Sequence, residues 1–193
     1  MKKLKMFAFV SIDGYSSRMN GDMDWVNIGN GKPVDQYDVS SFMESIDAVV
    51  MNRMQYILLQ SYGSIWPLAG KTCYVLSNKG DAFPLKDIYG IHPLILDQTK
   101  GYNASYYIRE LQAQDGEGDI WVMGDHRLTS YLLQLDMIDE MNIVRHPVLL
   151  GSGLSFIGDF GMETHWLVDE YLKYDTGAIL TKYRKIIPAA ATA

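Results

Sequence analysis

The stretch DIWVMGDHRLTSYLLQLDMIDEMNIVRHPVLLGSGLSFIG, residues 119–158, contains the pattern from which the fold is predicted. Ile120 to Met123 is a short apolar run that stops at Gly124, which is typical of a parallel strand with both faces buried. A second strand is predicted from about Glu140 to Val148, and one helix lies between the two strands. Strand, helix and strand together form the crossover unit that joins two parallel strands.

The predicted helix extends from about Arg127 to Leu135. Leu128, Tyr131, Leu132 and Leu135 are its inward-facing residues. Because their spacing places them on one helical face, we expect this helix to pack on the sheet. Asp125 occupies the N-cap position, where a good cap contributes ~1 kcal/mol. A strand that passes through a glycine into a helix start is also a place where anionic ligands bind, although many α/β proteins have such a turn with nothing bound.

Several short motifs in and around this unit resemble one known family. They are Met123-Gly124, Leu128, Leu132-Leu133, Ile138-Asp139-Glu140, Pro147 and Gly151-Ser152-Gly153. The pattern resembles the dihydrofolate reductase superfamily, and its closest branch is the RibD C-terminal-like domain of riboflavin biosynthesis with its small stand-alone relatives. The resemblance implies a three-layer α/β fold of the dihydrofolate reductase type, with a mostly parallel central sheet and a C-terminal antiparallel hairpin.

Composition favours one domain that binds a small molecule. The chain has 193 residues, of which 48% are hydrophobic, and this is enough for one core over residues 1–187 with a disordered tail at 188–193. Its net charge is −6 and no basic cluster is present, which disfavours a nucleic-acid or anionic-membrane surface. A single cysteine, Cys73, excludes an internal disulfide and a cysteine-based metal site. The scattered histidines predict no metal site either.

The N-terminal segment MKKLKMFAFVSIDG predicts the first strand, from Lys3 to Ile12. Its apolar run is too short for a signal peptide, and no segment approaches the ~20 apolar residues of a membrane span, so we expect a cytoplasmic protein. The strand delivers Ser11 and Asp13 to the edge where open α/β sheets bind ligands. The resemblance implies that this turn lies beside nicotinamide and substrate. Asp13 is otherwise a turn residue that precedes glycine.

Residues 15–33 are rich in Gly, Asn, Asp and Ser, which predicts a long loop of the kind that often binds ligands. Within this loop, Asp24-Trp25 resembles the Asp-Trp pair of the small stand-alone relatives. Trp25 therefore either walls a flat heteroaromatic ligand or fastens the loop to the core.

A helix is predicted from Val34 to Ile46. The resemblance implies that the corresponding helix carries the carboxylate that anchors a pterin ring, and Asp35 is the closest match in position. Asp38 and Glu44 are alternatives. Each of these residues is otherwise an ordinary helix acid, and an acid at a helix start is favoured by the dipole.

The next predicted strand, Ala48 to Met51, continues into Asn52-Arg53-Met54-Gln55-Tyr56. This turn resembles the family's Gly-Arg-x-Thr-Tyr turn, where a helix start and the arginine hold the cofactor phosphates. Arg53 and Tyr56 match the pattern, whereas Asn52 and Gln55 depart from it. Asparagine tolerates a left-handed backbone better than other non-glycine residues, which favours survival of the turn.

A third strand, Thr72 to Ser77, ends in Ser77-Asn78-Lys79-Gly80. This end resembles the family's turn at the adenosine 2′-phosphate. A hydroxyl, an amide and an ammonium group at one strand end suit that dianion and favour NADPH over NADH. The alternative is an ordinary polar turn.

The remaining pattern predicts a strand at Ile91–Leu96, a helix at Asn103–Gln114 capped by Asn103, and a terminal pair of strands. The pair comprises residues 165–174 and 178–186 around the hairpin turn Asp175-Thr176-Gly177. The antiparallel pair matches what the superfamily adds to its sheet. The resemblance implies that this end of the fold forms a homodimer.

The resemblance therefore implies an NADPH-dependent oxidoreductase that transfers a hydride to a pterin or to a ribosylamino-pyrimidine of riboflavin synthesis. Hydride transfer needs positioning more than a nucleophile, and the chain has no nucleophile elbow, P-loop or metal-ligand spacing. Asp13 and Asp35 are the candidate catalytic residues, with Ser11 and Trp25 at the substrate. The candidate cofactor-binding residues are Arg53, Met54, Ser77, Asn78, Lys79, Gly124, Asp125, Arg127 and Leu128.

Asp125 also motivates a different hypothesis. It stands where the family has the second glycine of a Gly-Gly pair, whose backbone lies against the pyrophosphate. A carboxylate there brings a like charge toward phosphate, and Arg127 offsets it. The alternative to a reductase is therefore a non-catalytic ligand-binding dimer on the same fold.

Overall fold

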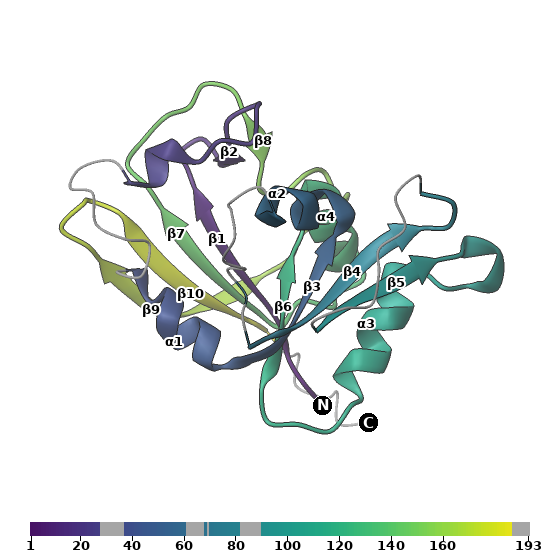
Figure 1. Cartoon of the computed structure of the whole chain (residues 1–193). Coiled ribbons are helices and arrows are strands. Elements are labelled where there is room, and N and C mark those ends of the chain that lie inside the picture. Colours follow the sequence, from purple (N-terminus) through teal and green to yellow (C-terminus); the bar gives the residue numbers. More distant parts are fainter. Residues whose placement is uncertain (28–36, 61–67, 69, 82–89, 187–193) are drawn as a thin grey trace.

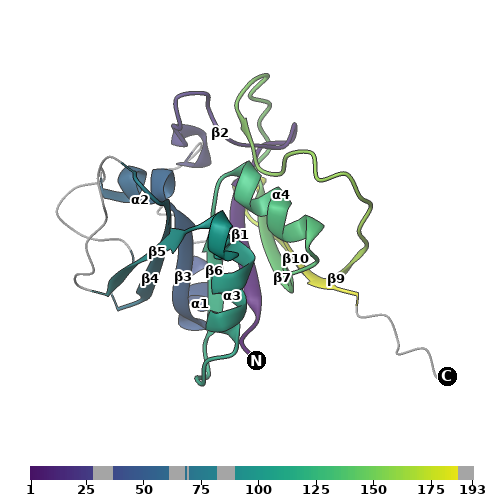
Figure 2. The ribbon, with the colours of Figure 1, turned by 90° about the vertical axis from the view of Figure 1, so that its right-hand side faces the viewer.

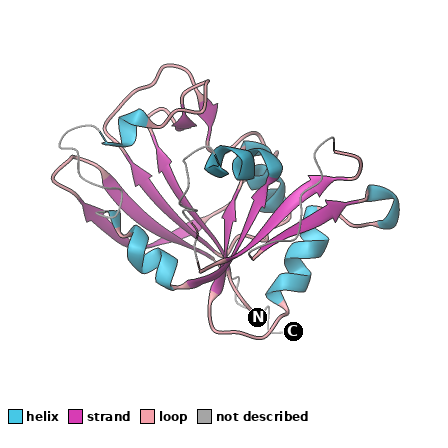
Figure 3. Ribbon diagram, viewed as in Figure 1, coloured by secondary structure: helices cyan, strands magenta, loops and turns pink. Residues whose placement is uncertain are grey.

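The computed structural model describes residues 1–27, 37–60, 68, 70–81 and 90–186. Its main sheet has eight strands in the order β5-β4-β3-β6-β1-β7-β10-β9 (Figures 1 and 3). The first six strands of this order are parallel, and β10 runs antiparallel to both β7 and β9. The predicted mostly parallel sheet with a C-terminal antiparallel hairpin is confirmed.

The strands of the main sheet are β1 (Leu4–Val10), β3 (Ile46–Asn52), β4 (Thr72–Asn78), β5 (Ile91–Leu96), β6 (Asp119–Met123), β7 (Glu140–Arg145), β9 (Trp166–Lys173) and β10 (Ile179–Lys185). A small second sheet pairs β2 (Tyr15–Ser17) with β8 (Leu154–Ser155). The helices are α1 (Val39–Glu44), α2 (Arg53–Gln60), α3 (Ala104–Gln112) and α4 (His126–Gln134), with 3-10 turns η1 (Asp24–Asn27) and η3 (Gln98–Lys100).

Helices cover both faces of the sheet and make three layers. Alternate residues of one strand point to opposite faces, so Val49 and Val50 of β3 belong to different cores. Val49 packs with Phe42 of α1 and Leu59 of α2. Val50 packs with the buried residues of α3 and α4, which lie in front of the strands in Figure 2.

On α4, Leu128 and Leu132 point inward as predicted and Tyr131 packs against the same core. The prediction for Leu135 is wrong, because this residue is the C-cap of α4 and is 38% exposed.

The central position of β1 is held at its start by the Asp139-Glu140 pair. The Leu4 backbone N–H donates to Asp139 Oδ2 at 2.7 Å, and Lys3 Nζ donates to Glu140 Oε1 at 2.6 Å. Burial raises the pKa of Asp139, and the hydrogen bond from Leu4 opposes that rise. The Ile138-Asp139-Glu140 motif therefore joins the starts of β1 and β7.

Three predicted boundaries differ from the structure. The helix expected from Val34 to Ile46 is α1, which begins at Val39, and Ile46 is already the first residue of β3. The strand expected to reach Val148 ends at Arg145, because Pro147 lacks the N–H that a ladder needs. The expected loop 15–33 contains β2 and η1 in its described part, while residues 28–33 and the tail 188–193 lie outside the described residues.

A third, aromatic core fastens η1 to the sheet. Trp25 and Tyr37 are each 1% exposed, and both pack on the His146 ring at the end of β7. The centroid of that ring lies 5.4 Å from the Trp25 ring and 5.1 Å from the Tyr37 ring. Because this site is apolar, burial lowers the pKa of His146.

The buried imidazole gives a testable dependence of stability on pH. Its folded pKa lies below the unfolded value of about 6.5, so the stability gained from a neutral His146 is complete above that pH and declines as pH falls toward the folded pKa. Between pH 6.5 and 5, we expect the free energy of unfolding of the wild type to fall more steeply than that of His146→Phe, by up to about 1.4 kcal/mol per pH unit. Urea unfolding at each pH measures both values.

His165→Phe is the matched control, since it removes an exposed imidazole outside the aromatic core and should leave the loss of stability caused by His146 in place. Equal slopes for the wild type and His146→Phe would contradict the assignment.

Candidate functional site

The carboxyl ends of four neighbouring strands, β4, β3, β6 and β1, meet at one rim, at the top of Figure 1. Ser77 to Lys79 end β4, Arg53 follows β3, Gly124 and Asp125 follow β6, and Ser11 to Asp13 follow β1. The starts of α2 and α4 are side by side, because β3 and β6 pair directly. The rim thus brings together the sequence-predicted residues from four segments. Asp35 lies outside the described residues.

At the end of β6, Asp125 caps α4 as predicted. Its Oδ1 accepts from the Arg127 N–H at 3.2 Å and from the Leu128 N–H at 3.1 Å, and its Oδ2 lies 2.9 Å from Arg127 Nη2. Burial raises the pKa of Asp125, but these hydrogen bonds and the nearby guanidinium outweigh it and hold the pKa below its usual range. The free N–H groups of α4 are therefore partly occupied by the chain's own carboxylate.

Gly124 and Leu128 belong to the same tight turn. A Cβ on Gly124 would lie 2.8 Å from Leu128 Cδ2, so only glycine fits there without movement of the helix. Leu128 is 8% exposed and packs in the core below α4. The packing of this turn explains both residues without a ligand, and their contact with a cofactor stays a prediction.

At the end of β3, Asn52 stands at the position of the glycine in the Gly-Arg-x-Thr-Tyr pattern. Its Oδ1 accepts from the Gln55 N–H at 2.9 Å, so the side chain caps α2. Asn52 does not adopt the left-handed backbone that we expected, since Asp38 and Asp136 are the only non-glycine residues with positive φ in the described chain. The turn survives because asparagine supplies an acceptor.

Arg53 is the first residue of α2 and directly follows β3. Its Nη1 is buried and has no hydrogen-bond partner among the described residues, and its Nε lies 4.0 Å from Asp81 Oδ2. The donors of the buried Nη1 atom are thus available to a further anionic group beside Asp81. Met54, the next residue, is 69% exposed at the rim.

At the end of β4, Ser77 and Asn78 of the polar turn both donate hydrogen bonds to Asp81. The sequence patterns had not indicated Asp81 as a residue of this site. Asp81 Oδ2 accepts from Ser77 Oγ at 2.6 Å and from the Asn78 N–H at 3.0 Å. The hydrogen bond from Ser77 holds the pKa of Asp81 below its usual range against the effect of burial. Lys79 Nζ donates to Asp97 Oδ2 at 3.2 Å. An aspartate four residues after a serine, in a Gly-containing turn, was the available signal.

At the end of β1, Asp13 ties two loops together. Its carboxylate accepts from Ser11 Oγ at 2.6 Å, and from the Leu150 and Gly151 N–H groups at 3.2 and 2.8 Å. The hydrogen bond from Ser11 leads the effects that hold the pKa of Asp13 below its usual range. The roles of Asp13 and Ser11 toward a substrate stay predictions, as does that of Trp25, whose ring is buried in the aromatic core.

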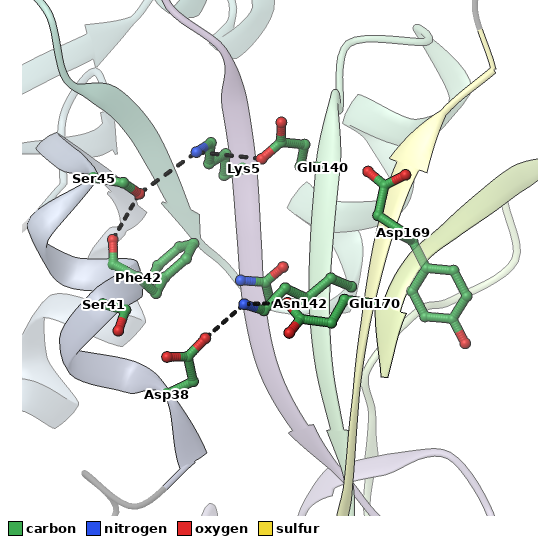
Figure 4. Close-up of a pocket in the computed structure, with 11 residues that line it drawn as sticks. Lys5, Asp38, Ser41, Phe42, Ser45, Glu140, Asn142, Asp169 and Glu170 are labelled. Atoms are coloured by element: carbon green, nitrogen blue, oxygen red, sulfur yellow. Dashed lines mark hydrogen bonds and ion pairs between the residues drawn. The ribbon is translucent and has the colours of Figure 1, made fainter. Parts of the chain in front are cut away.

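A cavity of about 450 Å³ lies away from this rim, on the flank of α1 (Figure 4). Lys182 Nζ lies 2.6 Å from Asp38 and 2.9 Å from Glu170, and Lys5 Nζ lies 2.8 Å from Asp119 and 3.2 Å from Glu140. The hydrogen bond from Lys182 holds the pKa of Asp38 below its usual range. The charges of this cavity are thus paired within the protein, and Asp38 is engaged as a structural partner.

The described part of the chain contains no group of three or more His, Cys, Asp or Glu side chains arranged to hold a metal ion. None of the helices in these ranges is long and apolar enough to cross a membrane.

The model of the family described as RibD C-terminal domain matches residues 91–180. A structure from Shewanella sp. PV-4, described only provisionally as a riboflavin biosynthesis protein, is 26% identical with a TM-score of 0.81, and the match covers 97% of this chain and all of that one. The uncharacterized protein YwjB of Bacillus subtilis (strain 168) is 27% identical over 163 residues, which cover 84% of this chain and 87% of YwjB.

RibD of Acinetobacter baumannii shares the fold at 17% identity, with a TM-score of 0.70. The match covers 96% of this chain and 58% of that RibD chain. The fold is thus that of RibD-like proteins, with the three layers of the dihydrofolate reductase type. The chain is similar to the RibD C-terminal domain over residues 91–180, in agreement with the family that the sequence motifs resemble.

Proposed function

We propose that the protein is an NADPH-dependent oxidoreductase of the cytoplasm that transfers a hydride to a small heterocycle, either a pterin or a 5-amino-6-(5-phosphoribosylamino)uracil type of substrate. The observation that carries the proposal is the adjacency of two helix starts, those of α2 and α4, on paired strands β3 and β6. Helix starts present N–H groups and positive dipole ends, which favour phosphate.

The rim residues fit a pyridine dinucleotide. The guanidinium of Arg53, whose Nη1 atom is buried without a partner among the described residues, supplies the cation that a pyrophosphate needs. Gly124 keeps the β6–α4 turn free of a side chain where a backbone contact would form. At the next strand, Asp13 joins the β1–β2 turn to the loop at Leu150 and Gly151, where a substrate would approach. The dinucleotide supplies the hydride, and the protein positions the two reactants and excludes water.

A non-catalytic ligand-binding role is the second candidate, and Asp125 favours it. Its carboxylate already accepts from two N–H groups at the start of α4, and it would stand beside a bound phosphate. The negative charges of Asp125 and of a phosphate at the start of α4 would repel each other. This repulsion would weaken cofactor binding, and without the cofactor no hydride transfer would occur.

Titration with NADPH and NADH separates the two candidates. For a reductase, we expect NADPH to raise the melting temperature, since a ligand at 100 times its Kd stabilises the folded state by about 2.7 kcal/mol. Absence of stabilisation by either dinucleotide at millimolar concentration would reject the reductase. Stabilisation without oxidation of NADPH in the presence of pterin and pyrimidine substrates would favour the binding role.

Replacement of Asp125 by glycine tests whether the Asp125 carboxylate weakens cofactor binding. Glycine is a tolerated N-cap that costs only a few tenths of a kcal/mol, so the fold should persist. We expect Asp125→Gly to tighten NADPH binding measured by calorimetry, because a like charge leaves the phosphate site. Asp115→Gly removes an exposed carboxylate from the loop before β6, at the opposite end of the sheet, and serves as the control for net charge. An unchanged NADPH affinity in Asp125→Gly means that repulsion is not the cause.

We also propose that the chain forms a homodimer through the β9–β10 end of the sheet. β9 is an edge strand with exposed apolar residues, among them Val168 at 55% and Tyr171 at 73% exposure. Natural proteins rarely leave an apolar edge strand uncovered, because its free backbone groups template pairing with another chain.

The oligomeric state in solution tests this surface. We expect light scattering after gel filtration to give a dimer for the wild type and a monomer for the double variant Val168→Lys with Tyr171→Lys. Met19→Lys is the control, since Met19 is 67% exposed in the loop after β2, outside the β9–β10 hairpin, and should leave the dimer intact. A monomeric wild type, or a dimeric double variant, would contradict the proposal.

A further inference from the structure

The end of β4 already holds an anion, and the protein itself supplies it. Ser77 Oγ and the Asn78 N–H both donate to Asp81 Oδ2, and Arg53 Nε lies 4.0 Å from the same oxygen. A hydroxyl, a backbone N–H and a guanidinium that converge on one oxygen are the donors that a phosphate oxygen would use. Asp81 therefore occupies an anion site of the rim.

The position of this anion site along the rim identifies the part of the ligand that would reach it. This step rests on the proposed reductase function, in which a dinucleotide lies across the helix starts of α2 and α4. β4 is separated from β6 by β3 alone, so the two strand ends lie about 10 Å apart. With the pyrophosphate at the helix starts and the nicotinamide toward β1, the adenosine ribose falls at the end of β4.

We propose that Asp81 is a specificity-determining residue of the cofactor site, whose carboxylate competes with a 2′-phosphate on the adenosine ribose and so narrows the preference for NADPH over NADH. A ribose without that phosphate presents only hydroxyl groups, which a carboxylate accepts as hydrogen-bond donors. A phosphate must displace Asp81 from Ser77 and Asn78 and remain close to its charge. Lys79 does not compensate, because its ammonium group pairs with Asp97.

The direct test compares the affinities of NADPH and NADH for the wild type and Asp81→Asn by calorimetry. Asparagine has nearly the same shape and keeps an acceptor for Ser77 and Asn78, so the turn should fold. We expect NADPH affinity to rise about fivefold or more, because a like charge is removed, while NADH affinity changes less than about twofold. Asp81→Ala should shift the ratio in the same direction.

Asp115→Asn is the matched control for net charge, because Asp115 is exposed in the loop before β6, at the opposite end of the sheet. It should leave both affinities unchanged. The fragments 2′,5′-ADP and 5′-AMP probe the adenosine end alone, and we expect Asp81→Asn to tighten only 2′,5′-ADP.

The outcomes distinguish this inference from the proposed function. If the dinucleotides bind but Asp81→Asn and Asp81→Ala leave the NADPH-to-NADH ratio unchanged, the role of Asp81 is overturned and the reductase proposal stands. If the ratio shifts equally in Asp115→Asn, net charge explains it and the role of Asp81 is again overturned. If neither dinucleotide nor fragment binds any variant, both proposals fail.

Discussion

The position of β1 between β6 and β7 is the constraint on which the rest of the structure depends. β1 pairs with β7 from Lys5 opposite Glu140 to Val10 opposite Arg145, and the Asp139 carboxylate holds its first N–H. Because of this register, β1 and β7 end side by side. The strand β6 pairs with both β1 and β3, so the carboxyl ends of β6 and β3 lie at the same edge of the sheet. The rim and the adjacent helix starts follow from it.

Sequence patterns predicted the order of the elements and most of their positions. Apolar runs that stop at glycine or at a polar turn marked the buried strands, and Asp125 and Asn103 both cap the helices that they were expected to begin. The family motifs gave the topology of the sheet, which no local pattern contains. Boundaries were wrong where a tertiary contact decided them, as at Ile46, which pairs with Asp119 in β3 and is not part of the preceding helix.

Side-chain partners at the rim were the part that the sequence could not supply. Each of three strand ends is closed by an aspartate of the chain, namely Asp13, Asp81 and Asp125, and each accepts from one or more backbone N–H groups. A carboxylate can satisfy free N–H groups or contact a ligand, and the same residue type serves both needs. Only the measured distances show that these three are engaged within the protein.

The long reach of β1 also bears on how the chain folds. β1 is the first strand of the chain, yet Leu4 pairs with Ile120 and Val10 with Arg145. Loop-closure entropy opposes contacts between such distant segments, so folds of high contact order acquire their native pairing slowly. During synthesis, the apolar side chains of β1 must wait until the chain has grown past β7. Molecular chaperones that shield nascent apolar segments would act on this interval.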